Sequence, residues 1–274
     1  MNRALSDLLS IIGKSLAKTI KVSAFVFMLV PILIAIYQSF LPTVAFEAFP
    51  KDGFTLRWFR ILFQPEFLRA VGISLMIATL ATGISLVCGI FAALVLARTN
   101  FKGRELVNML FLSPIMIPPV VKGISFIFYF AIIGLRPGLT SLFLAHVVIT
   151  LPYVIRVVYP CFYGLDRSLE DASRNLGANE FQTFLRVTLP LIKPGVLSGA
   201  IFGFIMSIDD VGVSIFLITP ETVNLAVLLL TWSRSIADNT LAAISTALVL
   251  VTFAVSVLAE KLVGLDSILG GLRH

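Results

Sequence analysis

Long apolar stretches separated by short polar segments dominate the pattern of this chain. A helix needs about 20 predominantly apolar residues to cross a bilayer. Six stretches reach this length: 22–40, 70–97, 106–135, 139–164, 196–218 and 241–259. A seventh apolar run, 224–232, is too short to cross and is expected to be an extracytoplasmic or re-entrant piece. The runs are long and do not alternate between apolar and polar positions, which favours helices over a barrel. The sequence therefore predicts an all-α membrane protein with six transmembrane helices.

Composition supports the membrane assignment. Hydrophobic residues make up 58% of the chain and charged residues only 13%, whereas a soluble domain has about 25% charged residues. The first apolar stretch has no good small-residue cleavage site after it, so we interpret it as a membrane anchor and not as a signal peptide. Cys88 and Cys161 lie in apolar stretches without a CxxC spacing, and are expected to be small hydrophobic residues.

The placement of the basic residues predicts the orientation of the chain. With six spans and cytoplasmic termini, the inner set would be Arg3, Lys14, Lys18, Lys21, Arg98, Lys102, Arg104, Arg167, Arg174, Arg186, Lys193, Lys261 and Arg273. The outer set would be Lys51, Arg57, Arg60, Arg69, Arg136 and Arg234. Because the inner set is more than twice as large, the positive-inside rule favours cytoplasmic termini. The net charge of +6 is explained by these clusters between spans, and no nucleic-acid partner is expected.

The predicted organisation has three parts. Residues 1–21 form a cytoplasmic N-terminal segment, 22–260 form the transmembrane domain, and 261–274 form a cytoplasmic tail. Two ladders of small residues, at every fourth position, run along the second and fifth spans: Ala81, Ser85, Gly89, Ala93 and Ala97, then Gly195, Gly199, Gly203 and Ser207. Small residues at this spacing allow helix backbones to approach closely in lipid. Packing within the chain and a subunit interface both remain open as interpretations.

The longest polar segment between spans, 166–193, is the most informative part of the chain. Ser168 is positioned to cap a short helix that would run to Leu176 and stop at Gly177, a typical left-handed terminator. Asn179 is expected to cap a second helix with an apolar face of Phe181, Phe184 and Leu185, which Pro190 would end. The sequence predicts helix, glycine turn and helix on the cytoplasmic side. A solvated amphipathic loop without function would share this pattern.

The same segment resembles the EAA loop of the permease subunits of binding-protein-dependent ABC importers. That motif has Glu-Ala-Ala, a glycine three residues later, and Ile-x-Leu-Pro after nine more. Here the corresponding residues are Asp171, Ala172, Ser173, Gly177, Val187, Thr188, Leu189 and Pro190. Asp171, Ser173 and Val187 depart conservatively from the motif, and Glu170 adds an acidic residue out of register. The segments 54–58, 70–75 and 207–211 resemble the polyamine-type (spermidine/putrescine) branch of this family, so the resemblance covers about residues 54 to 260.

This resemblance implies a role as half of the channel of a type I ABC importer in a bacterial inner membrane. Glu170, Asp171, Ala172, Ser173, Gly177, Leu189 and Pro190 would couple the chain to an ATPase. The implied partners are cytoplasmic ATPase subunits, a second related permease, an extracytoplasmic solute-binding protein and the lipid bilayer. The implied solute is small and polar: a polyamine-like compound, an opine or an amino-acid derivative. No cofactor is expected in this chain, since ATP and magnesium would bind the ATPase. The fragment Gly13-Lys14-Ser15 lacks the first glycine of a phosphate loop.

Ionisable side chains inside spans are energetically expensive and often functional. Lys122 follows two prolines in the third span, and Asp209 and Asp210 lie late in the fifth. These three residues are candidates for contact with the transported solute, but they could equally pair with one another. Arg156 is expected to extend towards the cytoplasmic interface. His146 is expected to be a hydrogen-bonded packing residue, with a proton relay as the alternative.

Two other classes of membrane protein are alternatives. An ion-coupled secondary transporter would show broken helices and internal repeats, and no convincing repeat relates the two halves of this sequence. An intramembrane enzyme would need catalytic motifs, and neither HExxH nor GxSxG occurs. The sequence therefore favours a permease that does not hydrolyse ATP itself.

Overall fold

The computed structural model describes residues 2–44, 53–236 and 238–263. The described residues form helices joined by turns, and no strand occurs among them, which confirms the all-α class. They fall into two compact units: residues 1–64 with 232–274, and residues 65–231. We refer to these as the first and the second unit. Most of the predicted tail 261–274, together with the basic residues Lys51 and Arg273, lies outside the described residues.

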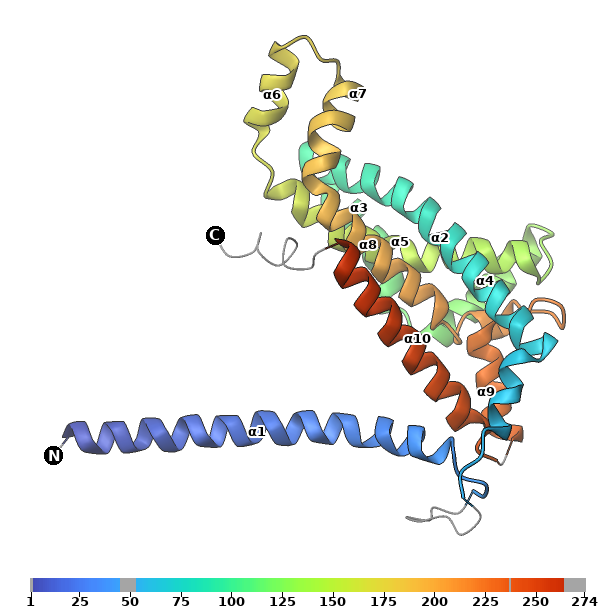
Figure 1. Ribbon diagram of the computed structural model, residues 1–274. Helices are drawn as coiled ribbons and strands as arrows, with labels where there is room; N and C mark the ends of the chain where they lie inside the picture. The colour runs from blue at the N-terminus through green and yellow to red at the C-terminus, as the bar shows by residue number, and fades with distance from the viewer. Residues whose placement is uncertain (1, 45–52, 237, 264–274) are drawn as a thin grey trace. The chain divides into compact units, whose positions relative to one another are not determined.

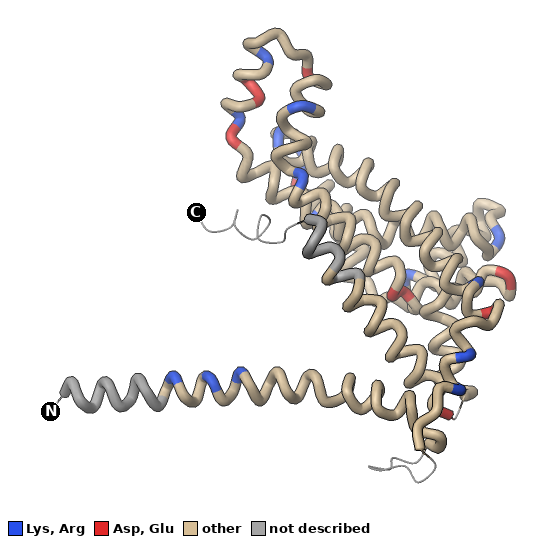
Figure 2. The backbone as a smooth tube through the Cα atoms, in the orientation of Figure 1, with Lys and Arg blue, Asp and Glu red and all other residues tan. Residues whose placement is uncertain are grey.

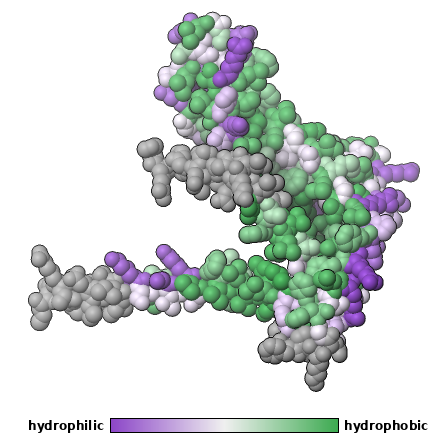
Figure 3. All heavy atoms as spheres, in the orientation of Figure 1, coloured by the Kyte–Doolittle hydropathy of each residue, from purple (hydrophilic) through white to green (hydrophobic). Residues whose placement is uncertain are grey.

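The first unit contains α1 (Asn2–Gln38), the 3-10 helix η1 (Arg57–Phe63) and α10 (Thr240–Val263) (Figure 1). The predicted N-terminal segment continues into the first span as one helix of 37 residues. Its stretch Gly13–Gln38 is long and apolar enough to cross a membrane, and none of the residues in its most apolar part is buried within the structure. Hydrophobic surface covers the later part of α1, beyond its lysines (Figure 3). A helix that is apolar all round is suited to lipid.

Asn239 ties the end of α1 to the start of α10. Its side-chain NH2 donates to the carbonyls of Leu41 at 3.1 Å and Thr43 at 2.7 Å, and its oxygen accepts from Gln38 at 3.2 Å. The indole of Trp58 in η1 donates to the same Leu41 carbonyl at 2.8 Å, and the Arg57 guanidinium lies 4.1 Å from the centre of the Trp58 ring. A tryptophan with one polar contact and an arginine on its face suits the membrane interface.

The second unit is built on three long helices, α2 (Pro65–Arg98), α5 (Leu139–Tyr163) and α8 (Leu189–Ile208), which pack against one another. The remaining elements of this unit are α3 (Arg104–Met116), α4 (Pro119–Ile132), α6 (Arg167–Asn175), α7 (Glu180–Thr183), the π-helix η2 (Phe184–Thr188) and the 3-10 helix η3 (Ser214–Phe216). A further helix, α9 (Leu225–Ser235), follows η3 and has 11 residues. This confirms that the seventh apolar run is too short to span.

The two small-residue ladders lie at the contacts between these three helices. Gly89, Gly199 and Gly203 are buried, and a Cβ at Gly89 would lie 2.7 Å from Val154 Cγ1. A Cβ at Gly203 would meet Thr82 at 3.3 Å and Val154 at 3.4 Å. The ladders therefore bring α2 and α8 against α5, which confirms packing within the chain. Two apolar clusters fill the surrounding space: Ile77, Phe130, Leu142, Ala145, Ile149, Val213 and Leu217, then Ala93, Val154, Val158, Phe162 and Ile192.

The prediction of one helix over 106–135 is wrong. The chain breaks between α3 and α4, which are bent by 108°. Ile117 and Pro118 both precede a proline and both adopt extended ψ values, 130° and 138°. The ring of each following proline clashes with a helical conformation of the residue before it, so two consecutive prolines force two non-helical residues.

The prediction for 196–218 is wrong at both ends. The helix α8 begins at Leu189 and ends at Ile208, and Asp209 is its C-cap. The carboxylate of Asp210 then accepts hydrogen bonds from the backbone N–H groups of Val213 (3.1 Å) and Ser214 (2.9 Å). A side chain that takes over backbone donors in this way competes with a continuing helix.

Four helices are long and apolar enough to cross a membrane, or five if the bent pair α3–α4 counts as one span, within the described residues. The apolar part of α10, Thr240–Ala254, is shorter than this limit. A multi-pass membrane protein is therefore established, and the count of six remains a prediction.

Candidate functional site

The segment between α5 and α8 forms the helix, turn and helix that the sequence predicts. Figure 2 shows that acidic and basic residues gather on this end of the second unit, whereas the shafts of α2, α5 and α8 carry few. The N-cap of α6 is Asp166 and not Ser168, so this helix begins two residues earlier than the predicted cap implies. The backbone N–H of Ser168 donates to the Asp166 carboxylate at 2.9 Å. This bond favours the ionised form and lowers the pKa of Asp166 below its usual value.

Gly177 ends this arm of the loop in the predicted manner. Its φ is +91°, in the left-handed region that strains residues with a Cβ. The N–H of Gly177 donates to the carbonyl of Arg174 at 2.9 Å, and that of Ala178 to the carbonyl of Ser173 at 3.2 Å. This pair of bonds is a Schellman motif. The glycine thus sets a sharp turn from α6 into the next helix.

The second arm of the loop, α7 and η2 (residues 180–188), begins as predicted but does not end at the predicted position. Asn179 and Gln182 form a full capping box. Beyond α7 the chain continues through the π-helix η2 into α8, as one run from Glu180 to Ile208. The prediction that Pro190 ends this helix is therefore wrong. Pro190 lies in the first turn of α8, directly after the π-helix, where the N–H of Leu189 bonds to the carbonyl of Phe184. The change of register there accommodates a residue that has no N–H to donate.

The predicted apolar face of this arm is divided. Phe181 and Leu185 are exposed, at 67% and 43%. Phe184 instead stacks on Phe91 of α2, with ring centroids 5.7 Å apart. Phe184 therefore packs within the chain, whereas Phe181 and Leu185 lie on the exposed surface.

The two acidic residues of the motif have different surroundings. Asp171 is exposed and pairs with Arg174 at 2.9 Å, and Arg174 also contacts Glu180 at 2.9 Å. The hydrogen bond with the Glu180 carboxylate, and to a smaller extent the charge of Asp171, raises the pKa of Arg174. Glu170 is buried and contacts Arg98 at 3.1 Å and the hydroxyl of Thr188 at 2.8 Å. The sequence did not predict these partners of Glu170, because they come from α2 and from the π-helix.

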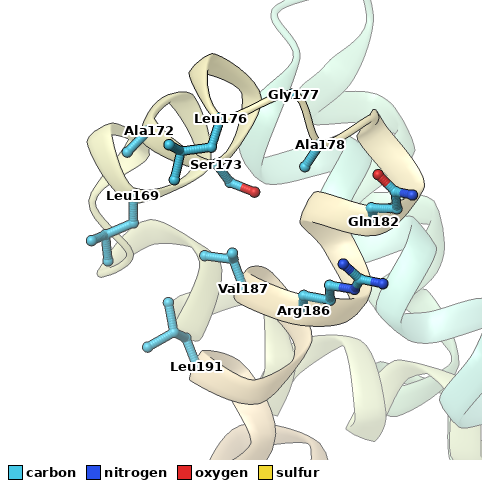
Figure 4. Close-up of a pocket in the computed structure, with 10 residues that line it drawn as sticks. All are labelled: Leu169, Ala172, Ser173, Leu176, Gly177, Ala178, Gln182, Arg186, Val187 and Leu191. Atoms are coloured by element: carbon cyan, nitrogen blue, oxygen red, sulfur yellow. The ribbon is translucent and has the colours of Figure 1, made fainter.

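A groove of about 590 Å³ lies between α6 and the second arm (Figure 4). Its lining is mostly apolar, with Ser173, Gln182 and Arg186 as the polar members: Leu169, Ala172, Ser173, Leu176, Gly177, Ala178, Gln182, Arg186, Val187 and Leu191. Leu176 at the end of α6 is 89% exposed. Leucines exposed beside such a groove indicate an interaction surface. Of the predicted site residues, Ala172, Ser173 and Gly177 line this groove, whereas Leu189 and Pro190 begin α8 below it.

Lys122, Asp209 and Asp210 lie where α4 meets the loop after α8. A Cβ on Gly123, next to Lys122, would clash with the ring of Phe216 and would lie 2.7 Å from the carbonyl oxygen of Gly212. Lys122 is half-buried and interacts electrostatically with Asp210. Asp209 is exposed, whereas the carboxylate of Asp210 is only 10% exposed. The structure therefore brings the three candidates to one region, and Asp209 is the one of the three that is exposed.

A buried polar network extends from Asp210. His146 is 1% exposed, and its two ring nitrogens lie 2.7 Å from the Ser207 hydroxyl and 3.0 Å from the Ser214 hydroxyl. Ser214 also receives a hydrogen bond from Asn224 at 2.8 Å, and bonds to Asp210 at 3.0 Å. The sequence predicted hydrogen-bonded packing for His146, which these contacts confirm. Its partners were not identified, because they lie 61 and 68 positions away along the chain.

Comparison with known proteins shows which family this chain belongs to. Residues 85–264 match the model of the family described as binding-protein-dependent transport system inner membrane component. The chain is 30% identical over 260 residues to the spermidine/putrescine transport system permease protein PotC of Escherichia coli strain K12, covering 94% of this chain and 97% of that protein. It is 31% identical over 212 residues to the putrescine transport system permease protein PotI of the same strain, covering 74% and 75%.

Solved structures show the same fold. A chain of a bacterial ABC transporter involved in the import of the acidic polysaccharide alginate aligns with a TM-score of 0.71 at 17% identity, over 96% of this chain and 99% of that one. A chain of an amino acid ABC transporter aligns with a TM-score of 0.54 at 19% identity, over 75% and 94%. The family match over residues 85–264, together with the full-length similarity to PotC, shows that this chain belongs to the inner-membrane permeases of binding-protein-dependent ABC importers.

Proposed function

We propose that this permease carries a small cationic solute of the polyamine type and is driven by ATPase subunits that dock on the segment 166–193. The observation that carries the solute class is the similarity to PotC along almost the whole of both chains. The exposed carboxylate of Asp209, beside the bent pair α3–α4, supports it because an anionic group suits a polycation. An opine or an amino-acid derivative is the second candidate, favoured by the positive charge of Lys122 in the same region.

The docking surface is proposed from the geometry of the loop. The helix α6 is held by a Schellman turn and presents Asp171 and Leu176. A charged residue and an apolar anchor on one short helix are suited to a complementary cleft on another protein. Asp171 would exchange its partner Arg174 for a basic group of the ATPase. Glu170, Ala172, Ser173, Gly177, Leu189 and Pro190 would hold this helix and its turn in place.

The rest of the assembly follows from this proposal. ATP and magnesium would bind to the ATPase subunits, and this chain would have no catalytic activity of its own. A second related permease would complete the channel, and an extracytoplasmic binding protein would deliver the solute. Both termini would be cytoplasmic, and segment 166–193 would then lie on the ATPase side. Membership of the importer family argues against the ion-coupled secondary transporter.

Transport by the reconstituted complex tests this proposal. The chain, its partner permease and the ATPase are placed in proteoliposomes, and the binding protein is added outside with labelled spermidine, putrescine, an opine or an amino acid. We expect uptake of a polyamine that requires ATP and the binding protein and that persists when a protonophore collapses the proton gradient. Uptake that follows the gradient without ATP would refute the ATP-driven mechanism. Preference for an opine or amino acid would refute the solute class alone.

A further inference from the structure

Glu170 joins three elements of the second unit that are far apart in sequence. Its carboxylate contacts Arg98, the last residue of α2, at 3.1 Å, and the hydroxyl of Thr188, the last residue of the π-helix, at 2.8 Å. The side chains of Glu170 and Arg98 are only 9% and 15% exposed, and Thr188 is 2% exposed. We call Arg98, Glu170 and Thr188 the bridge. It links α6 to two membrane helices, α2 and α8.

The π-helix explains how the second arm meets α6 at two points. Thr183 and Thr188 are both buried and both face α6, since Thr183 lies 3.2 Å from the hydroxyl of Ser173. In an α-helix, residues five positions apart are rotated by about 140° beyond one full turn, so they would face different sides. In a π-helix, the hydrogen bond closes over five residues and brings positions five apart to the same side. The π-helix therefore turns Thr188 towards Glu170.

Because the bridge is buried, its ion pair is costly to separate. Separating a buried ion pair leaves a charge without compensation in a medium that solvates it poorly, which costs much more than breaking an exposed pair. The Nε of Arg98 is itself buried and has no hydrogen-bond partner in the described part of the chain, and the guanidinium contacts Glu170 through its Nη2. Asp171, in contrast, pairs with Arg174 on the open surface. Displacement of α6 is therefore expected to carry α2 and α8 with it.

We propose that Glu170 is a positioning residue that transmits the movement of α6 to α2 and α8 through Arg98 and Thr188. This inference rests on the proposed docking of an ATPase at α6. It assigns different roles to neighbouring acids: Asp171 faces the partner, and Glu170 connects the partner's movement to the membrane helices. Loss of the bridge uncouples ATP hydrolysis from transport while the complex still assembles.

The substitution Glu170→Gln tests the proposal in the complete complex in proteoliposomes. Glutamine keeps the shape of glutamate and one acceptor oxygen, which can still accept from Arg98 and Thr188, but it removes the charge. We expect the ATPase to remain bound and to hydrolyse ATP, while solute taken up per ATP hydrolysed falls about tenfold, the change that corresponds to about 1.4 kcal/mol of lost coupling. Glu105→Gln is the matched control, because it makes the same change at an exposed glutamate in the first turn of α3, outside segment 166–193, and it should leave the ratio unchanged.

A double-mutant cycle identifies the pair. Arg98→Met should lower the ratio as Glu170→Gln does, and the double variant should be no worse than either single one, because one interaction is removed in all three. Thr188→Val removes only the hydroxyl and should give a smaller decrease. Additive effects, an unchanged ratio in Glu170→Gln, or loss of assembly in both Glu170→Gln and Thr188→Val would overturn the proposal. Failure of the docking proposal is distinguishable, since the unaltered chain would then bind no ATPase.

Discussion

Asp209 and Asp210 are consecutive residues with opposite environments. Asp209, the C-cap of α8, is exposed, whereas the Asp210 carboxylate turns back and accepts from the N–H groups of Val213 and Ser214 at 3.1 and 2.9 Å. Asp210 also lies 3.9 Å from the ring of His146. One carboxylate therefore organises the loop after α8, and the other remains available to a ligand.

This difference predicts separate effects of the two amide substitutions. Asp209→Asn should alter polyamine uptake, by about threefold or more in KM if it removes one charged contact, and should leave assembly and the melting temperature unchanged. Asp210→Asn should lower the stability of the purified complex by about 1–2 kcal/mol, since an amide replaces a charged acceptor. Thermal unfolding and uptake, measured on the same preparations, distinguish the two. A stability loss in Asp209→Asn with normal KM would reverse the assignment.

Lys122 provides a test of charge in the same region. If it faces the solute, Lys122→Met should lower KM for a polyamine, because a positive charge that repels a cation is removed, while Lys122→Arg should resemble the unaltered chain. The complex should assemble in all cases, since Lys122 is only half-buried. Uptake kinetics with spermidine and with an uncharged analogue provide the measurement. If Lys122→Met and Asp209→Asn both transport normally, these residues are structural.

The loop 166–193 shows how far local sequence rules reach. Asn179, Gln182 and Gly177 act on backbone groups within a few residues, and capping and turn preferences predicted their roles. The cap of α6 was displaced by two residues because Asp166 and Ser168 are both good caps, and only the backbone conformation selects one. The π-helix was missed for a different reason. It places Thr188 against Glu170, a contact across 18 positions that no local pattern predicts.

The spans show the same limit. Hydropathy identified the apolar stretches but could not show where a stretch is interrupted, because a broken helix is as apolar as an intact one. Pro118 and Pro119 lie within the third stretch, and the bend of 108° arises there because both residues that precede a proline are extended. The end of α8 depends on the side chain of Asp210, whose partners lie beyond the helix.

The backbone conformation of Gly177 predicts a graded series. At φ +91°, a Cβ costs about 1–2 kcal/mol, and asparagine tolerates the left-handed region better than alanine or a β-branched residue. Gly177→Asn should retain most ATPase docking and uptake, Gly177→Ala less, and Gly177→Val least, with membrane insertion unchanged in all three. Co-purification of the ATPase and uptake in vesicles test the order. Normal uptake in Gly177→Val would exclude a coupling role for this turn.

Gly89 and Gly72 form a matched pair within α2. A Cβ at Gly89 would lie 2.7 Å from Val154 Cγ1, whereas nothing lies within 4 Å of one at Gly72. Gly89→Ala should therefore destabilise the protein by about 1–3 kcal/mol through overpacking, and Gly72→Ala should be neutral or stabilising because alanine favours the helix. Combining Gly89→Ala with Val154→Ala should recover part of the loss. Melting temperatures of the purified variants test all three, and equal effects at the two glycines would contradict the close packing of α2 on α5.

His146 distinguishes a structural network from a proton relay. Its ring nitrogens contact Ser207 and Ser214, and Ser214 is also held by Asn224 and Asp210. His146→Leu would remove the ring nitrogen that the buried Ser207 hydroxyl contacts, and should cost about 1–3 kcal/mol because that hydroxyl is left unsatisfied, whereas Ser214 keeps its bonds to Asn224 and Asp210. His146→Gln retains hydrogen-bonding groups but cannot titrate between pH 5 and 8. If the network is structural, His146→Gln should keep most of its stability and transport with an unchanged pH profile. A relay requires the titrating ring, so His146→Gln would then abolish uptake while the complex still assembled and melted normally.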